Sequence, residues 1–448
     1  MTAPAHPTAS RRAATLQLAA IGTLLLIATA AGPALHHRLG GWALLGIFAV
    51  CGGGAYLAWR LVDRCDPRHA LLIVLAGAIA MRLALLFVEP YLSTDVYRYI
   101  WDGRVQAAGF NPYRHMPGAA EVSHLRDPDI FPNINRVDSA VTIYPPIAQA
   151  FFLAITRLGE SVVVMKLGLL AFEAATIAAI MALLDRQGLA RARVAVYAWH
   201  PLPIWEIAGS GHVDAVMCAL LMFGLVAFLG QRTLLAGVLV SLGALVKPTA
   251  LLALPVFWRP WDWRLPLVVV ATITIAYLPY LGVGAGVLGY LPGYLEEEGL
   301  NSGRGINLLW LLEWVLGPLP GYLRTIYVAA AALIMLVLAL KVGLRSDRSA
   351  QGALDALRWL LVAFLILASP HYPWYFLVLV PFLVLSPSAS AWVLTLGGVL
   401  LYDVIGGDVL PSYNVRLSLF TLATFAAVAF DIVHERRAAG LSPTWTRP

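Results

Sequence analysis

About fourteen apolar runs divide the chain, and they constrain its fold more than any other feature. The runs cover approximately residues 15–33, 42–59, 70–89, 161–184, 194–208, 213–229, 233–246, 248–258, 265–283, 323–343, 355–369, 374–387, 391–405 and 416–433. A helix needs about 20 apolar residues to cross the hydrocarbon core of a bilayer. Several runs are shorter and flanked by Pro or Gly, a pattern typical of broken helices that line a cavity. We therefore predict an all-α, polytopic transmembrane helical bundle of about fourteen spans.

The composition excludes several other classes of protein. Apolar residues make up 60% of the 448 positions and charged residues only 12%, whereas soluble domains are about 25% charged. The net charge of +6 does not indicate nucleic-acid binding, because the basic residues are scattered between apolar runs rather than clustered on one face. The three cysteines, Cys51, Cys65 and Cys218, form neither a disulfide framework nor a zinc-ligand spacing.

Lys and Arg in the loops predict the orientation in the membrane. With the N-terminus inside, the inside loops receive the basic residues near 60–68, 186–193, 232, 259–264, 341–348 and 436–437, as the positive-inside rule requires. Residues 90–160 then form one large extracytoplasmic loop. The run 144–157 within it is too short to span and is predicted to be a juxtamembrane or re-entrant helix. We expect a single domain, residues 1–448, in a bacterial plasma membrane.

The first apolar run has a second interpretation. It follows Arg11 and Arg12 and ends in small residues, which also describes a secretory signal. Because further spans follow at once, we interpret it as an uncleaved anchor. Cleavage would leave the remaining topology unchanged.

Under this topology the unusual polar motifs collect on the extracytoplasmic side. They occupy residues 93–115 (STDVYRYIWDGRVQAAGFNPYRH), 144–149 (YPPIAQ), 209–214 (GSGHVD), 247–248 (KP), 296–307 and 369–375 (SPHYPWY). The candidate site residues are Asp95, Arg98, Asp102, Arg104, Asn111, Tyr113, Tyr144, Gln149, His212, Asp214, Lys247, Arg304, His371, Tyr372 and Trp374. Chance would scatter such motifs over both faces of the membrane, so their gathering on one face predicts a site there.

The segment 95–104 gives the sharpest signal. On a helix, Asp95, Arg98 and Asp102 fall at positions i, i+3 and i+7 and share one stripe. The alternative is an interfacial helix with aromatic anchors and a surface Asp–Arg pair. Charged residues near a membrane interface are less costly than at its centre, so both interpretations stay open.

Two motifs near the middle of the chain also admit two interpretations. His212 and Asp214 lie in a Gly-flanked turn, where they could serve a sugar or a metal, or form a loop pair satisfied by water. Lys247 lies between two apolar stretches and precedes Pro248. A lysine in that position must snorkel, pair with an acidic group, or face a cavity.

Two later segments are less decisive. The prolines that flank His371 and Tyr372 predict an extended, rigid turn facing the outer cavity, where aromatic rings would stack on a sugar. An aromatic belt at the membrane interface would also explain the Trp and Tyr residues there. The acidic triplet Glu296–Glu298 is interpreted as a solvated loop segment.

In this order, the motifs resemble those of integral-membrane glycosyltransferases of the GT-C fold, in particular the bacterial polyprenol-phosphate-mannose-dependent mannosyltransferases. The segments that carry the resemblance are STDVYRYIWDG, YPP before a short apolar helix, GHVD after WHPLP, LVKP and SPHYPWY. The resemblance runs from about residue 70 to the end of the chain. This sequence has about three spans before the large loop where many members have one, and two added spans preserve the sidedness.

The resemblance implies an enzyme that takes a mannose-like hexose from a polyprenyl-phosphate carrier at the outer membrane surface. It would pass the sugar to a hydroxyl of a lipid or cell-envelope glycan by inverting displacement. In this family the acidic residue early in the first large loop is the base, which assigns that role to Asp95, with Arg98 as the neighbouring cation that keeps it ionised. A phosphate leaves as a stabilised anion, so one carboxylate suffices without a general acid.

The remaining candidates divide into two groups. The candidates for the cationic clamp on the donor phosphate are Arg98, Arg104, Lys247 and Arg304. The candidates for binding the sugar or the acceptor are Asp102, Asn111, Tyr113, Tyr144, Gln149, His212, Asp214, His371, Tyr372 and Trp374. No metal ligands are assigned, and a divalent metal requirement stays open.

The expected partners are the lipid bilayer, the polyprenyl-phosphate-linked sugar and a lipid or glycan acceptor, with no nucleic acid. Two alternative functions remain. A secondary transporter or lipid flippase would show paired halves with broken helices and charges at mid-membrane, whereas here the polar residues gather on one face. A polysaccharide polymerase or ligase that uses lipid-linked sugars would share the same carriers.

Overall fold

The computed structural model describes residues 7–299, 305–402 and 411–438, and within these ranges the chain is helical and has no strand. This confirms the all-α prediction. Eight helical segments in the described part are long and apolar enough to cross a membrane, rather than about fourteen. They are Ser10–Leu39, Gly41–Arg64, Pro67–Leu86, Val162–Arg186, Arg264–Glu297, Gly321–Gly343, Ala350–Ala368 and Tyr413–Arg437. The other predicted runs form shorter or interrupted helices, so the count of fourteen is not confirmed.

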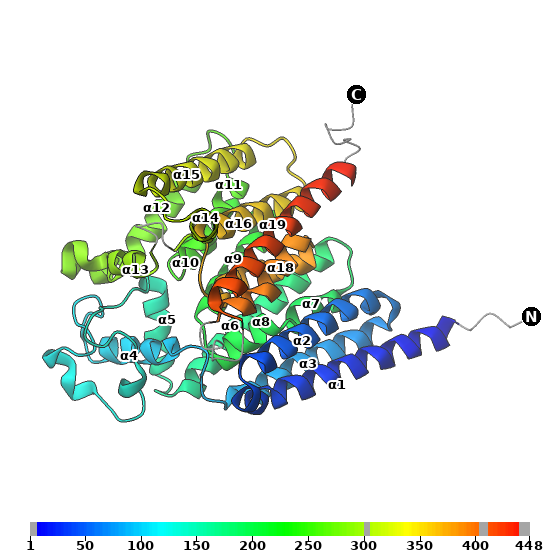
Figure 1. The fold of residues 1–448 in the computed structure, drawn as a ribbon, viewed down its shortest axis with the longest axis horizontal. Coiled ribbons are helices and arrows are strands. Elements are labelled where there is room, and N and C mark those ends of the chain that lie inside the picture. Colours follow the sequence, from blue (N-terminus) through cyan, green and yellow to red (C-terminus); the bar gives the residue numbers. More distant parts are fainter. Residues whose placement is uncertain (1–6, 300–304, 403–410, 439–448) are drawn as a thin grey trace, which may run out of the picture.

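The first three long helices lie side by side. They are α1 (Pro7–Leu39), α2 (Gly41–Leu61) with the short turn η1 (Val62–Arg64), and α3 (Pro67–Leu86). Helix α1 packs against both α2 and α3, and Figure 1 shows the three running along one side of the molecule. A buried ion pair joins this group to the centre, because Arg82 of α3 contacts Glu173 of α6 (Val162–Arg186) at 2.6 Å.

The large loop carries its own short helices. They are α4 (Asp95–Ala107), η2 (Ala120–Leu125), η3 (Phe131–Asn133) and α5 (Pro146–Thr156). Helices α4 and α5 approach closely at Gly103, where a Cβ atom would fall 2.5 Å from the carbonyl oxygen of Phe152. The 11 residues of α5 reach about 16 Å at 1.5 Å per residue, roughly half of a bilayer core. Helix α5 is therefore too short to span, as the sequence predicts.

The centre of the molecule is built from interrupted helices. After α6 come η4 (Arg191–Val194), α7 (Ala195–Ala198), α8 (Pro201–Pro203), the π-helical segment η5 (Ile204–Gly209), α9 (Asp214–Leu229), α10 (Thr233–Ala244), η6 (Pro248–Ala253) and α11 (Leu254–Phe257). The breaks coincide with Pro201 and Pro248, because proline fixes φ and lacks the amide hydrogen that a continuing helix needs. Two of the predicted runs, 194–208 and 248–258, are thus helical but broken.

The C-terminal part contains both surface-exposed and buried helices. It comprises α12 (Arg264–Tyr277), η7 (Leu278–Leu288), α13 (Leu291–Glu297), α14 (Asn307–Leu316), α15 (Gly321–Gly343), α16 (Ala350–Ala368), η8 (Pro373–Leu379), α17 (Val380–Leu385), α18 (Ala389–Gly397), η9 (Gly398–Leu401) and α19 (Tyr413–Ala438). Helices α12 and α15 expose most of their apolar side chains, whereas every residue of α17 is buried.

The elements of the large loop lie apart from the two ends of the described chain. In Figure 1, α4, α5 and α13 are on the left, while the start of α1 and the end of α19 are on the right. The helices that carry the predicted segments in the large loop, together with α13, therefore lie on one side of the molecule.

Candidate active site

Asp95 is the first residue of α4, and its carboxylate is held by two hydrogen bonds. Its Oδ1 accepts from Asn135 Nδ2 at 3.0 Å, and its Oδ2 accepts from the Tyr144 hydroxyl at 3.2 Å. Its position in the first helical turn also favours a negative charge. The side chain remains 23% exposed. Asp95 is thus fixed in orientation and still accessible to a substrate hydroxyl.

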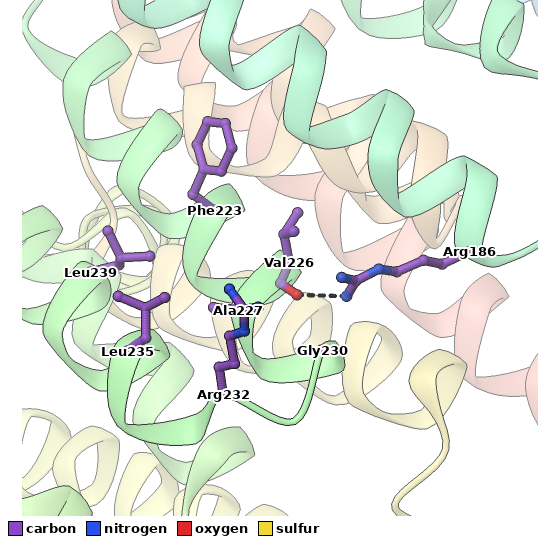
Figure 2. A pocket seen from close by; sticks show the side chains of 8 residues that line it. All are labelled: Arg186, Phe223, Val226, Ala227, Gly230, Arg232, Leu235 and Leu239. Carbon is purple, nitrogen blue, oxygen red and sulfur yellow. Dashed lines mark hydrogen bonds between the residues drawn. The ribbon is translucent and has the colours of Figure 1, made fainter.

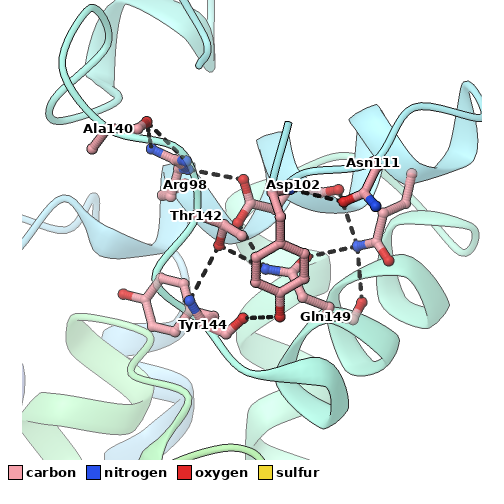
Figure 3. Close-up of polar contacts among 9 residues, drawn as sticks. Arg98, Asp102, Asn111, Ala140, Thr142, Tyr144 and Gln149 are labelled. Atoms are coloured by element: carbon pink, nitrogen blue, oxygen red, sulfur yellow. Dashed lines mark hydrogen bonds and ion pairs between the residues drawn. The ribbon is translucent and has the colours of Figure 1, made fainter. Parts of the chain in front are cut away.

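Arg98 and Asp102 form a buried ion pair one and two turns further along α4. Arg98 Nε donates to Asp102 Oδ1 at 2.8 Å, and both of its terminal nitrogens donate to the Ala140 carbonyl oxygen. Only about a twentieth of Arg98 is exposed. The expectation that Arg98 is the cation paired with Asp95 is therefore wrong, because its donors go to Asp102 and Ala140 instead (Figure 3).

Gln149 of α5 extends this network towards the loop that carries Tyr144. Its Nε2 donates to Asp102 Oδ2 at 3.0 Å and to Thr142 Oγ1 at 2.7 Å (Figure 3). On the other side, the Tyr113 hydroxyl donates to the Tyr144 carbonyl oxygen at 2.7 Å. The network therefore supports the loop that places the Tyr144 hydroxyl on Asp95.

Asn111 belongs to the same support. Its Oδ1 accepts a hydrogen bond from the Tyr113 amide at 3.0 Å, and its Nδ2 lies 3.5 Å from the Tyr280 carbonyl oxygen. The first contact orders the turn that precedes Tyr113. The second connects the large loop with η7.

His212 lies between two carboxylates. Its Nδ1 is 2.8 Å from Glu206 Oε2, and its Nε2 is 4.0 Å from Asp95 Oδ2. Gly211 makes this placement possible, because its φ of +79° is a left-handed conformation that other residues rarely adopt. The turn returns the chain so that the His212 amide donates to the Glu206 carbonyl oxygen at 2.8 Å.

Lys247 pairs with an acidic residue, one of the three options that the sequence left open. Its Nζ lies 2.8 Å from Asp214 Oδ2 and 4.5 Å from the centre of the Tyr375 ring. The residue before a proline is biased towards extended backbone, and Lys247 has φ −143° and ψ 129°. This geometry turns the chain out of α10 and directs the ammonium group towards Asp214.

Stacked aromatic rings extend from His212. The Trp374 ring lies 4.2 Å from the His212 ring and 4.5 Å from the Tyr372 ring, measured between centroids. Tyr372 has φ −120° and ψ 139°, which confirms the extended backbone predicted before Pro373. The three rings form a rigid wall beside Asp95.

His371 connects the segment that carries these aromatic rings to a neighbouring helix. Its Nδ1 is 3.0 Å from Glu298 Oε2, and its Nε2 is 2.7 Å from the Gly305 carbonyl oxygen. Burial lowers the pKa of His371, but the hydrogen bonds to these two groups outweigh that effect and raise the pKa above its ordinary value. His371 therefore ties the aromatic segment to α13.

The acidic triplet is only partly solvated, because Glu296 and Glu297 are exposed as the sequence predicts, whereas Glu298 is buried. Glu297 Oε2 lies 2.7 Å from Arg136 Nε, and Glu298 pairs with His371. The Tyr294 and Tyr375 hydroxyls also share a hydrogen bond. These contacts join α13 to the loop and to the aromatic segment that border Asp95.

Arg104 has its partners elsewhere in the large loop. It contacts the carboxylates of Asp127 and Glu160 and donates to the Leu125 carbonyl oxygen. The remaining predicted cation, Arg304, lies outside the described residues.

Asn135, Arg136 and Glu206 were not predicted, whereas Glu298 and Tyr375 lie in the predicted polar segments 296–307 and 369–375 but had no individual role. Glu206 did have a signal, since an ionisable side chain inside an apolar run marks a functional or structural site by default. Asn135 and Arg136 lie in an irregular loop without periodicity, where only the folded structure shows what they contact.

A hollow of about 320 Å³ lies elsewhere, beside α9 and α10. It is lined by Arg186, Phe223, Val226, Ala227, Gly230, Arg232, Leu235 and Leu239, and Figure 2 shows Arg186 reaching the Val226 carbonyl oxygen. Its lining has no carboxylate and none of the predicted site residues. Across the described ranges, no group of three or more His, Cys, Asp and Glu side chains is arranged to hold a metal ion.

Comparison with known proteins places the chain among mannosyltransferase sequences. The chain is 28% identical over 220 residues to "Alpha-(1->6)-mannopyranosyltransferase A" of Corynebacterium glutamicum. That match spans 44% of this chain and 41% of the relative, so it covers about two fifths of the relative's length. No solved structure matches the chain.

A family profile gives the broader match. Residues 12–261, more than half of the chain, match the MptA_B family, described as "Alpha-(1->6)-mannopyranosyltransferase, N-terminal domain". The matched region contains Asp95, Tyr144, His212 and Lys247. The chain therefore belongs to the MptA_B family of alpha-(1->6)-mannopyranosyltransferases.

Proposed function

We propose that this protein transfers mannose from a polyprenyl-phosphate donor to the 6-hydroxyl of a mannose in a lipid or cell-envelope glycan. The observation that carries the proposal is the meeting of a partly exposed carboxylate, Asp95, with a cation, Lys247, and a wall of stacked rings at Trp374. A base, a phosphate ligand and a sugar platform are what such a transfer needs.

The stereochemistry fits a single displacement. Asp95 takes the proton of the acceptor hydroxyl while the acceptor oxygen attacks C1 of the donor sugar. The phosphate leaves with the electrons of the bond to C1. Such a step inverts the configuration at C1, so an α product requires a β-linked donor. The alpha linkage in the family name supports this assignment.

The contacts of the three predicted cations that the structure describes favour different roles. Arg98 and Arg104 are each bound to a carboxylate within the large loop, so we propose that they position that loop. Lys247 also has a carboxylate partner, but it lies beside Tyr375 in the cluster itself. We therefore propose Lys247 as the ligand of the donor phosphate, with Arg136 at the border of the cluster as a second cation.

The cluster also supports treating residues 1–448 as one catalytic domain. Asp95, His212 and Lys247 precede residue 261, where the family match ends, while Trp374 and Tyr375 follow it. We propose that this site faces the exterior of a bacterial plasma membrane. The Arg-rich loops assigned to the inside support that orientation.

We expect the purified protein to transfer mannose from polyprenyl-phosphate mannose to a short mannoside with a free 6-hydroxyl. GDP-mannose should not replace this donor, because the proposed site binds a lipid phosphate at the membrane. Mass spectrometry would detect the product, and NMR of its anomeric carbon would show the α-1,6 linkage. Transfer from the nucleotide sugar alone, or a β-linked product, would reject the proposal.

Lys247→Gln should weaken donor binding by about 10–100-fold, because a hydrogen bond to a charged group contributes about 1.5–3 kcal/mol. Glutamine can still donate to Asp214, so the fold is expected to survive the change. Isothermal titration with the donor in detergent would measure the dissociation constant. The exposed Lys341, changed to Gln, is the matched control and should bind as wild type. An unchanged dissociation constant in Lys247→Gln would remove Lys247 from the site.

A further inference from the structure

Glu206 is a fully buried carboxylate that the proposed reaction leaves without a role. None of its side chain is exposed, and an unpaired buried charge is strongly destabilising. Its Oε1 accepts a hydrogen bond from the Tyr402 hydroxyl, and its Oε2 lies 2.8 Å from His212 Nδ1. Glu206 therefore accepts a hydrogen bond from a neutral donor on one oxygen, while its other oxygen makes an ion-pair contact with an imidazole that leads to Asp95.

The local chain is shaped to bring these groups together. Glu206 lies in the π-helical segment η5, and π-helical turns occur frequently at functional sites. The turn at Gly211 then places His212 back against Glu206. Stacking on Trp374 fixes the plane of the imidazole ring. His212 therefore has one ring nitrogen on Glu206 and the other directed at Asp95.

The third contact of this series is longer. His212 Nε2 is 4.0 Å from Asp95 Oδ2, beyond the range of a hydrogen bond. Catalytic hydrogen bonds are often long in the absence of substrate and shorten in the reacting complex. Tyr144 holds the same oxygen of Asp95, so the contact with His212 requires the carboxylate to turn from that hydrogen bond towards the imidazole when substrate binds.

We propose that Glu206 and His212 form a proton relay behind Asp95, an inference that rests on the proposed transferase function. Asp95 takes the proton from the acceptor hydroxyl as the C–O bond forms and the bond from C1 to the phosphate oxygen breaks. The proton then moves from Asp95 Oδ2 to His212 Nε2, and the Glu206 carboxylate stabilises the resulting imidazolium at Nδ1. When the products leave, the buried His212 returns the proton through Asp95, whose side chain is 23% exposed, to water, so the site is reset.

A second buried pair shows what a purely structural arrangement looks like in this chain. Glu173 of α6 binds the Arg82 guanidinium through both carboxylate oxygens, at 2.6 and 3.1 Å. A guanidinium stays charged and cannot pass a proton on. Glu206 instead binds an imidazole, the side chain whose ordinary pKa allows it to accept and release a proton near neutral pH.

The charged and titratable groups around His212 come from several elements. Glu206 and Asp214 from its own part of the chain and Asp95 from α4 act on the ring directly. Lys166 of α6 and Tyr99 of α4 lie against the adjacent residues Gly211 and Val213, while Tyr144 binds Asp95 and Lys247 binds Asp214. Burial lowers the pKa of His212, but the charges of Glu206, Asp95 and Asp214 outweigh it and raise the pKa above its ordinary value.

The raised pKa of His212 determines the expected pH dependence of turnover. His212 must be neutral to take the proton from Asp95, so turnover should fall as the pH drops through the raised pKa of His212. Removing the charge of Glu206 lowers that pKa. The acid limb of the rate profile should then move to lower pH, while the plateau rate should fall because the imidazolium has lost its counter-charge.

The test is the pH profile of kcat for Glu206→Gln, measured with polyprenyl-phosphate mannose and a mannoside acceptor. We expect kcat to fall about 100-fold with an unchanged KM for the donor, and the acid limb to shift to lower pH. His212→Gln should show the same loss of kcat and serves as the second variant where Glu206→Gln does not fold. Glu173→Gln, the control for a lost buried charge, should lower thermal stability but keep the wild-type pH profile.

The outcomes separate the relay from the function on which it rests. Wild-type kcat and an unshifted acid limb in Glu206→Gln, together with inactivity of Asp95→Asn, would overturn the relay and leave the transferase intact. The same pH shift in Glu173→Gln would also overturn it, because the shift would then report loss of structure. A wild-type protein that transfers no mannose from the lipid donor would reject the proposed function, and the relay with it.

Discussion

Asp95→Asn is expected to lower turnover by about 10²–10⁴-fold, equivalent to roughly 3–5 kcal/mol of activation free energy. Asparagine keeps the size of the side chain, its oxygen can still accept a hydrogen bond from Asn135, and its amide group can donate to the Tyr144 hydroxyl oxygen in place of the bond that Asp95 accepts. It cannot take the proton of the acceptor hydroxyl. Donor binding should survive, because the proposed base contacts the acceptor rather than the phosphate. Initial rates and donor dissociation constants for the two proteins would measure both quantities.

Two other aspartates of the same loop serve as references. Asp129 is exposed, and Asp129→Asn should keep wild-type turnover. Asp102 is buried against Arg98 and Gln149, so the main effect of Asp102→Asn should be a loss of stability rather than a direct loss of turnover. Near wild-type turnover in Asp95→Asn, with turnover lost in a folded Asp102→Asn protein, would move the base to Asp102.

Arg98→Ala is expected to lower the free energy of unfolding by about 3–5 kcal/mol, the usual cost of removing one partner of a buried ion pair. The change leaves the buried Asp102 carboxylate without its counter-charge and the Ala140 carbonyl oxygen without its donors. Denaturant unfolding of the detergent-solubilised protein would measure the loss. Arg68 is exposed near the start of α3, and Arg68→Ala should change stability by less than about 0.5 kcal/mol.

This experiment also tests the sequence prediction that Arg98 holds the donor phosphate. If Arg98→Ala unfolds like the wild type but no longer binds the donor, Arg98 is a phosphate ligand and the positioning role proposed for it is wrong. If stability falls while the folded fraction binds the donor normally, the positioning role holds.

The helical fold could be predicted because the length of an apolar run identifies a membrane helix. The number of full spans could not, since apolar runs such as 194–208 and 374–387 are equally hydrophobic whether they cross the membrane or break inside it. Prolines at 201, 203 and 373 decide that question through backbone geometry. The sequence shows those prolines, but it does not show how the neighbouring helices accommodate them.

The site was predictable where a residue type was unusual for its surroundings. A lysine between apolar stretches and a histidine in a glycine turn both lie in the cluster, as Lys247 and His212. Arg98 shows the limit of helical periodicity. It lies three residues after Asp95 and four before Asp102, and either carboxylate was within reach on spacing alone. In the folded protein Arg98 pairs with Asp102, because its guanidinium also donates to the Ala140 carbonyl oxygen on that side.

The most direct test of the account is a structure of the Asp95→Asn protein with polyprenyl-phosphate mannose bound. This variant should retain the donor without turning it over. We predict that the phosphate lies against Lys247 Nζ and that C1 of the mannose faces residue 95, with the sugar beside the Trp374 ring. Donor phosphate bound instead in the hollow between Arg186 and Arg232 would contradict the assignment of the active site.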